Sequence, residues 1–285
     1  MQRERVADDI YVFTSDTYAQ VTAGLVITAD GSILIDTLVF PEETKAIKHF
    51  AEQRLARPVK YVINTHYHAD HTYGTCFFPG AVVVSHALCY DLLNTRGRAG
   101  LEQARAGMPE LNEVEIVLPQ LVFDTGIMNL RLGDKTLQLW HTPGHSLDSI
   151  VCLVKEDRIL FASDTLMPVP YFIDGDYNDF IRSLQSLQNN GFENVVQGHG
   201  EVILRGEIEE KITSDLHYLT AIKKYALAAR TKADPERYLD NVDIERCGKS
   251  RIALSGSVQQ LHQANLRTLY RQIATEVLEV GSTTG

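Results

Sequence analysis

Residues 65–74 read THYHADHTYG and place three histidines and an aspartate within six positions. These residues are His66, His68, Asp70 and His71. Neutral imidazole and carboxylate are the ligands that zinc and other borderline divalent ions prefer. The cluster therefore predicts a metal site, and a polar loop that happens to carry surface histidines is the alternative.

The spacing within this cluster suggests more than one metal position. On a strand end or an extended turn, His66 and His68 project to the same side because they are two residues apart. Asp70 and His71 lie further along and can face a second position nearby. The four residues can thus serve two metal ions rather than crowd around one.

Three later segments could complete such a site. They contain His145 in HTPGHS, Asp164 in LFASDT and His199 in VVQGHG. Each residue follows an expected strand and has glycine or small neighbours, which let the backbone approach closely. A lone histidine in a turn is more often a surface residue, but together with the first motif these segments give seven candidate ligands in one order.

The elements that must position these residues are short strands joined by helices. Apolar β-rich runs bounded by turn signals predict strands at 10–15, 21–28, 32–37, 59–65, 81–85, 120–124, 127–132, 135–140, 149–154, 158–163 and 193–197. Helical spacing predicts helices at 41–56, 86–94, 176–190, 207–230 and 258–280. Residues 95–113 are polar and poorly periodic, which is typical of an inserted loop or short helix.

The chain also contains a faint internal repeat. DGSILIDT (30–37) and EDRILFASDT (156–165) share a turn, an apolar strand and a final Asp-Thr. VKYVINTH (59–66) and FENVVQGH (192–199) share an apolar strand that ends in a histidine. We expect two similar α/β halves whose strand ends meet.

The order HxHxDH, His, Asp, His, with its TPGHS and SDT contexts, resembles the metallo-β-lactamase-fold hydrolase superfamily over roughly residues 9–205. The resemblance implies an α/β fold, a four-layer αββα sandwich of two similar halves with metals in a cleft at one edge of the sheets. Residues 1–205 would form the catalytic domain, and residues 206–285 a helical C-terminal extension packed on it.

The resemblance also implies the role of each site residue. One metal would be held by His66, His68 and His145, and the other by Asp70, His71 and His199, with Asp164 as a bridge between them. Asp36, at the end of the strand SILIDT, would fix a ligand imidazole, and an aspartate that merely starts the turn before Pro41 is the alternative.

Two divalent ions define the chemistry that we expect. Zinc is the first choice, with iron or manganese as alternatives. The ions would lower the pKa of a shared water from 15.7 toward about 7, so that a metal-bridging hydroxide attacks the carbonyl of a small ester, thioester or lactone. Asp70 would accept or relay a proton. Tyr171 could donate a hydrogen bond to the oxyanion or leaving group, or simply pack within its loop.

The same sequence pattern is compatible with other activities. An aspartate at position 164 argues against a dedicated β-lactamase, because enzymes of that kind generally carry cysteine or serine in this neighbourhood; weak β-lactamase side activity would still fit. Phosphodiesterases and nucleases of the same fold share the full ligand set, and a persulfide dioxygenase would use a single iron. A binding protein with a vestigial metal site is a further alternative.

The composition indicates which kinds of binding partner and which cellular compartment to expect. The formal net charge of −10 gives no basic footprint for nucleic acid or for an anionic membrane, so we expect a small-molecule substrate. No stretch approaches the apolar length of a membrane span. Four scattered cysteines without a CxxC pair favour the cytoplasm.

The C-terminal helices could wall the cleft or form a homodimer interface. We interpret the remaining histidines as structural or surface residues: His49, His86, His141, His217 and His262.

Overall fold

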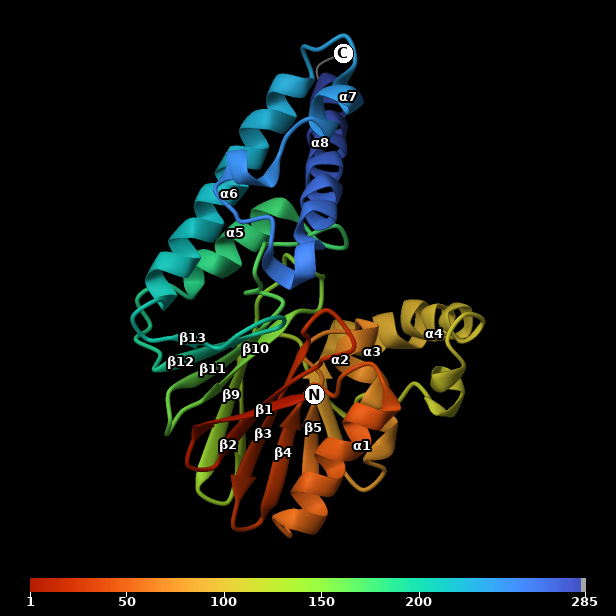
Figure 1. The fold of residues 1–285 in the computed structure, drawn as a ribbon, viewed down its shortest axis with the longest axis vertical. Coiled ribbons are helices and arrows are strands. Elements are labelled where there is room, and N and C mark those ends of the chain that lie inside the picture. Colours follow the sequence, from red (N-terminus) through yellow and green to blue (C-terminus); the bar gives the residue numbers. More distant parts are fainter. Residues whose placement is uncertain (283–285) are drawn as a thin grey trace.

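The computed structural model describes the backbone of residues 1–282 and the side chains as far as residue 275 (Figure 1). Two β-sheets occupy one end of the molecule, and the long C-terminal helices extend beyond the strands at the other. The chain begins in the first sheet, and residues 127–204 form the second.

The first sheet has seven strands in sequence order. The strands are β1 (Gln2–Ala7), β2 (Ile10–Thr14), β3 (Thr22–Thr28), β4 (Gly31–Ile35), β5 (Val59–Ile63), β6 (Val82–His86) and β7 (Leu121–Phe123). β1 to β4 pair antiparallel, whereas β4 to β7 pair parallel. Parallel strands need crossover connections, and α1 supplies the one between β4 and β5.

The second sheet has six strands and is mostly antiparallel. Its strands are β8 (Ile127–Leu132), β9 (Lys135–His141), β10 (Ile150–Val154), β11 (Ile159–Ser163), β12 (Asn194–Gln197) and β13 (Ile203–Leu204). β11 and β12 form its one parallel pair, and α5 connects them. The units β4–α1–β5 and β11–α5–β12 are thus built alike, which agrees with the repeat in the sequence.

Helices lie outside the two sheets, and the C-terminal ones extend beyond the strands. They are α1 (Pro41–His49), α2 (Ala69–Thr72), α3 (Ala87–Leu92), α4 (Arg98–Arg105), α5 (Tyr177–Ser186), α6 (Ile208–Ala229), α7 (Pro235–Asp240) and α8 (Val258–Ser282). Pro41 occupies the first turn of α1, where its missing N–H costs no hydrogen bond. The Asp176 side chain caps α5 by accepting a hydrogen bond from the Asp179 N–H at 2.8 Å.

Apolar cores between the sheets and on their outer faces hold these layers together. Between the sheets, Ile33 of β4 packs in one cluster with Leu139 of β9 and Phe161 of β11. On the outer face of the first sheet, Leu34 joins a cluster that includes Ile47 of α1. Adjacent residues of β4 therefore point into different cores, as the two-residue period of a strand requires. The expected four-layer αββα sandwich is confirmed.

The outer face of the second sheet shares its core with the C-terminal helices. One continuous cluster joins Leu160 of β11 and Phe180 of α5 to Ile222 of α6 and Leu266 of α8. The apolar faces of α6 and α8 thus pack within the chain. The domain boundary at residue 205 stays a prediction. Among the helices of residues 1–282, none combines the length and the apolar character that crossing a bilayer requires.

Two segments differ from the sequence prediction. Strand β1 was missed because its residues are mostly charged and exposed, and it joins the sheet through backbone pairing with β2. The stretch 231–257, which lies between two predicted helices and has no predicted element of its own, contains α7 and short helical turns. Residues 95–113 form α4 and a 3₁₀ turn at Pro109–Glu113, which matches the short-helix alternative.

Candidate metal centre

The candidate ligands all follow strands at one edge of the sandwich. The motif 66–71 comes after β5, and His145 comes after β9. Asp164 follows β11 directly, and His199 lies just beyond β12. Asp36 follows β4, the neighbour of β5. Strand ends from both sheets therefore bring the predicted site residues together.

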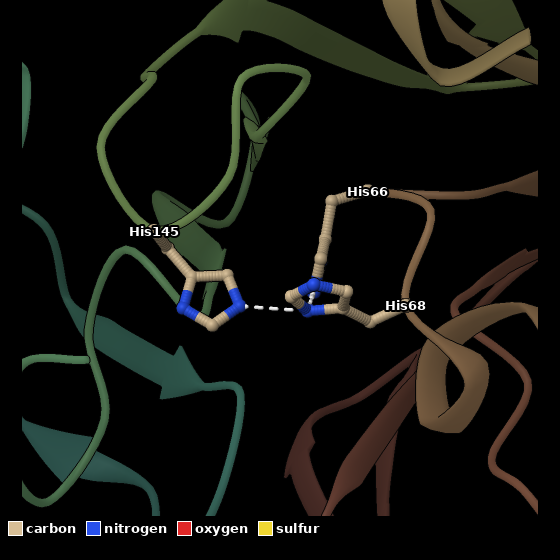
Figure 2. A group of neighbouring side chains, drawn as sticks. All are labelled: His66, His68 and His145. Atoms are coloured by element: carbon tan, nitrogen blue, oxygen red, sulfur yellow. Dashed lines mark hydrogen bonds between the residues drawn. The ribbon is translucent and has the colours of Figure 1, made fainter. Parts of the chain in front are cut away.

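Three histidines form the first group, which we call the three-histidine group: His66, His68 and His145. Nδ1 of His68 lies 3.0 Å from Nε2 of His66 and 2.9 Å from Nε2 of His145. Figure 2 shows His145 facing the other two rings from the opposite side of the site. One nitrogen of each ring thus points to a common centre.

A second group combines a carboxylate with two histidines, and we call it the mixed group: Asp70, His71 and His199. Oδ2 of Asp70 lies 3.4 Å from Nε2 of His199 and 3.8 Å from Nε2 of His71. Nitrogen and carboxylate oxygen atoms in this arrangement can hold a divalent cation.

Asp164 lies between the two groups. Its Oδ1 is 3.3 Å from Nε2 of His71, and its Oδ2 is 3.3 Å from Nε2 of His145 and 3.5 Å from Nε2 of His199. The same carboxylate therefore contacts histidines of both groups. His66, His71 and Asp164 also lie close enough to form a third ligand set, so the two groups are contiguous.

In four of the candidate ligand histidines, one ring nitrogen points away from the cluster. That nitrogen lies against a carbonyl or carboxylate oxygen, which can only accept a hydrogen bond. Nδ1 of His145 donates to the Tyr171 carbonyl at 2.7 Å, and Nδ1 of His199 donates to the Ala19 carbonyl at 2.9 Å. Nδ1 of His71 lies 2.8 Å from the Asp36 carboxylate. These partners assign the proton to the outer nitrogen and leave the lone pair of the inner nitrogen facing the cluster.

The fourth such ring is His68, which Asp174 approaches from the surface side. Nε2 of His68 lies 3.4 Å from Oδ2 of Asp174. The same carboxylate accepts hydrogen bonds from the Tyr67 hydroxyl and from Nη1 of Arg96, the latter at 2.6 Å. Asp174 thus fixes His68 in the orientation that directs Nδ1 inward.

Asp36 is buried beneath the cluster and is itself held by neighbours. Its Oδ1 accepts from the Thr65 N–H at 2.9 Å, and its Oδ2 accepts from the Thr65 hydroxyl at 2.8 Å. Ser163 lies 2.7 Å from the Thr65 hydroxyl and completes the hydrogen-bond network. This carboxylate therefore orients His71 rather than merely starting a turn.

Burial and nearby charges shift the pKa values of several cluster residues in opposite directions. Burial lowers the pKa of His66 far below its usual value and that of His145 to about 4, so both imidazoles stay neutral. Burial also acts on His71 and His199, but nearby carboxylates, Asp164 first, outweigh it and raise the pKa of both. Burial would raise the pKa of Asp164, yet His199, His145 and His71 hold it well below the usual range.

The donor set fits a metal ion. Among the described residues, Nε2 of His71 and Oδ1 of Asp164 are buried without a hydrogen-bond partner, although they lie 3.3 Å apart. Buried polar atoms rarely lack a partner. An ion bound at about 2.0–2.2 Å from nitrogen and oxygen ligands would satisfy both atoms.

Close backbone packing places Asp164. A Cβ added to Gly198 would lie 1.8 Å from Oδ1 of Asp164 and 2.7 Å from the carbonyl carbon of Ser163. The Gly198 N–H donates to the Ser163 carbonyl at 2.8 Å. Ser163 itself has a left-handed φ of 45°, which is strained for a residue with a side chain. Only glycine at position 198 leaves room for this carboxylate.

The remaining predictions concern residues outside the ligand groups. Tyr171 contributes its backbone carbonyl to His145, and its phenol is half-buried nearby. His86 and His141 stack on each other with ring centroids 4.1 Å apart. His262 is buried between Tyr218 and the Val242 carbonyl. The described contacts of these three histidines are thus structural, as expected.

Sequence reasoning missed several residues that shape the site. Thr65 was visible as the first residue of the motif, but its hydroxyl contact to Asp36 depends on the fold. Asp174 and Tyr18 carry no local signal, because they reach the site from distant segments. Tyr18 lies near enough to Asp70 that this carboxylate, followed by burial, raises the pKa of the phenol to about 12.

Comparison with known proteins places the chain in a family. Residues 16–203 match the family model described as the metallo-beta-lactamase superfamily. The lactamase-like protein aptB of Emericella nidulans is 28% identical over 180 residues, which are 63% of this chain and 50% of that protein. The human acyl-coenzyme A thioesterase MBLAC2 is 31% identical over 168 residues, or 52% of this chain and 59% of that protein. The chain spans about half the length of the first of these relatives.

Solved structures share the fold. The sec-alkylsulfatase Pisa1 from Pseudomonas sp. superimposes with a TM-score of 0.75 at 14% identity, covering 95% of this chain and 50% of that one. The superposition thus includes the C-terminal helices as well as the sandwich. Because the family model spans more than half of its length, the chain belongs to the metallo-beta-lactamase superfamily.

Proposed function

We propose that this protein is a dinuclear metal-dependent hydrolase of a small ester, thioester or lactone, in which attack at the carbonyl carbon breaks the acyl carbon–oxygen or carbon–sulfur single bond. The observation that carries the proposal is the position of Asp164, whose two oxygens face His71 on one side and His145 on the other. A carboxylate that contacts both ligand groups could serve a pair of metal ions at once.

We assign the proposed ions to two positions. His66, His68 and His145 would hold one, Asp70, His71 and His199 would hold the other, and Asp164 would contact both. Zinc is the ion that we propose first, since neutral imidazole and carboxylate suit it, and iron and manganese accept the same ligands. When bound, the ions supply a water of lowered pKa and a Lewis acid for the carbonyl oxygen.

Asp70 is the residue that we assign to proton transfer. Its side chain is 14% exposed, against 5% for Asp164, so it is the more accessible of the two carboxylates. During hydrolysis the water oxygen bonds to the carbonyl carbon, and the carbon–oxygen or carbon–sulfur bond breaks. Asp70 would accept the water proton and pass it toward the departing alcohol or thiol.

Two phenols lie beside the site and can contact substrate. Tyr171 and Tyr18 are each close to the cluster, and burial raises the pKa of Tyr171. A phenol keeps its proton at neutral pH and can donate a hydrogen bond. We propose Tyr171 as the donor to the oxyanion or leaving group.

The substrate class has support from one relative. The human relative is named as an acyl-coenzyme A thioesterase, and it is 31% identical over 168 residues, which cover 52% of this chain. Thioesters share with esters and lactones a trigonal carbonyl carbon that hydrolysis makes tetrahedral. We therefore place thioesters first within the proposed class.

A substrate panel on protein of known metal content tests this proposal. The panel contains an acyl-coenzyme A, a lactone, an aryl ester, an alkyl sulfate, a phosphodiester and a β-lactam. We expect the acyl-coenzyme A, the lactone and the aryl ester to have the highest kcat/KM. Preference for the phosphodiester would replace the proposal with phosphodiesterase activity. One iron per chain together with oxygen uptake on a persulfide would replace it with dioxygenase activity.

The variant Asp164→Asn tests the shared carboxylate. Loss of one charged ligand should weaken metal binding and lower turnover by at least about 100-fold, the upper end of the cost of disturbing a metal ligand's partner. Asp157→Asn is the control, because this aspartate pairs with Lys135 at the opposite end of β9. Equal turnover in the two variants would refute the shared role.

A further inference from the structure

The loop of residues 166–175 supports two members of the three-histidine group. This loop leads from β11 to α5. Its residue Tyr171 accepts the Nδ1 hydrogen bond of His145 at 2.7 Å, and its residue Asp174 lies 3.4 Å from Nε2 of His68. Its position therefore determines where two of the three inward nitrogens point.

Helix α8 of the C-terminal extension holds this loop at Asn265. Nδ2 of Asn265 donates to the Pro170 carbonyl at 2.6 Å, and Oδ1 accepts from the Phe172 N–H at 3.3 Å. One side-chain amide thus brackets Tyr171, the residue whose carbonyl orients His145. Each bond substitutes for a backbone partner that the irregular loop lacks.

The bracket is buried and its own orientation is fixed. Asn265 is fully buried. Its Nδ2 also lies 3.1 Å from the Tyr218 hydroxyl, which in turn lies 3.0 Å from Nδ1 of His262. An amide held on three sides cannot rotate without losing buried hydrogen bonds, and each unsatisfied buried group is costly. The amide is therefore a rigid support for the loop.

Two further contacts tie the same loop to the C-terminal helices. Nε2 of Gln272 donates to the Gly175 carbonyl at 3.3 Å, from a position two turns along α8 from Asn265. Nζ of Lys211, on α6, donates to the Met167 carbonyl at 2.7 Å. The two rings of the mixed group have other partners among the described residues: His71 rests on Asp36 and His199 on the Ala19 carbonyl.

We propose that Asn265 is a positioning residue that sets the affinity of the three-histidine group for its metal ion. The C-terminal helices would then determine the occupancy of one metal position and not of the other. This inference rests on the proposed function, because it requires that both groups bind metal.

Metal affinity measured separately for the two positions tests the inference. Zn²⁺ is titrated into the metal-free chain of residues 1–285 in competition with a chromophoric chelator. We expect Asn265→Asp, which keeps the volume but removes the donor to Pro170, to weaken one of two zinc sites by about 10- to 100-fold. The other site should keep its affinity within about twofold.

Variants that lack one group identify the weakened site. In a chain that also carries His199→Ala, Asn265→Asp should weaken the remaining ion by the same factor. In a chain that carries His68→Ala, Asn265→Asp should leave the zinc affinity of the remaining site unchanged. A similar loss in both backgrounds would overturn the inference, since a general loosening of the fold weakens both sites.

Leu269→Ala is the matched control for stability. Leu269 is buried on α8, one turn beyond Asn265, and belongs to the core shared with α5 and α6. Its truncation should lower thermal stability while both zinc affinities stay unchanged. If Leu269→Ala weakens the same site as strongly, the role of Asn265 is merely structural and the inference fails. A wild-type chain that binds fewer than two zinc ions would instead refute the dinuclear proposal.

Discussion

Oδ2 of Asp36 lies 2.8 Å from Nδ1 of His71 and accepts a hydrogen bond from the Thr65 hydroxyl at the same distance. Thr65 immediately precedes His66, so one buried carboxylate links members of both ligand groups. The structure thereby connects the end of β4 to the end of β5, its parallel neighbour.

Replacement of this carboxylate should weaken metal binding without removing a ligand. In Asp36→Asn the negative charge beside His71 is lost, and with it the preference for a proton on Nδ1. We expect metal affinity to fall by about 10- to 100-fold. Chelator competition measures the change, and Asp30→Asn, in the exposed turn before β4, is the control. Unchanged affinity in Asp36→Asn would mean that His71 is oriented by other contacts.

Gly198→Ala should displace Asp164. The new methyl would lie 1.8 Å from Oδ1 of Asp164 and 2.7 Å from the backbone of Ser163, so the carboxylate or the backbone must move. Overpacking of this kind costs about 1–3 kcal/mol of stability, and we expect metal affinity and turnover to fall with it.

Gly206→Ala is the control for this substitution, because a methyl group at Gly206 would meet no atom within 4 Å. Urea unfolding and metal titration on both variants give the comparison. If Gly198→Ala binds metal as the native chain does, the carboxylate does not need the space that this glycine leaves.

Metal removal should lower the melting temperature markedly. An ion at 1,000 times its Kd stabilises a folded protein by about 4 kcal/mol, and for a chain of this size this corresponds to a shift on the order of 10 °C. Calorimetry before and after dialysis against a chelator measures the shift. His199→Ala, which removes one candidate ligand, should show a smaller difference; an equal difference would exclude His199 from metal binding.

His262 should make the fold sensitive to acid. Burial lowers its pKa to about 4 in the folded protein, whereas the unfolded chain has the ordinary value of about 6.5. Between these values the unfolded chain binds the proton more readily, so stability falls as the pH drops through this window. From pH 7.5 to pH 5 the loss from this residue is about 2 kcal/mol.

The variant His262→Gln isolates this contribution, because glutamine does not titrate and can still accept from Tyr218 and donate to the Val242 carbonyl. Urea unfolding at pH 7.5 and pH 5 should show a smaller acid loss in His262→Gln than in the native chain, by about 2 kcal/mol. Identical losses would show that His262 is already protonated in the folded state or titrates normally.

The sequence predicts those parts of the site that depend on local pattern. The motif 66–71 and the turns at His145, Asp164 and His199 each follow an apolar strand, and parallel strand ends must meet at one edge of a sheet. The αββα layers follow from the same strands, because their apolar runs require cover on both faces.

Contacts between distant segments could not be predicted in the same way. Asp174 reaches His68, and Asn265 reaches the loop 166–175, only after the helices dock on the second sheet. No spacing rule connects residues that meet through tertiary packing. Strand β1 could not be predicted either, because its exposed and charged residues show no alternation of apolar and polar positions. It joins the sheet through backbone pairing with β2.

Each ligand group draws on both halves of the sandwich. His66 and His68 follow β5 of the first sheet, whereas His145 follows β9 of the second, and Asp70 and His71 likewise need His199 from beyond β12. A growing chain on the ribosome therefore cannot present a complete set before the second half has emerged and docked. Metal binding would therefore follow the folding of both halves and would not nucleate it.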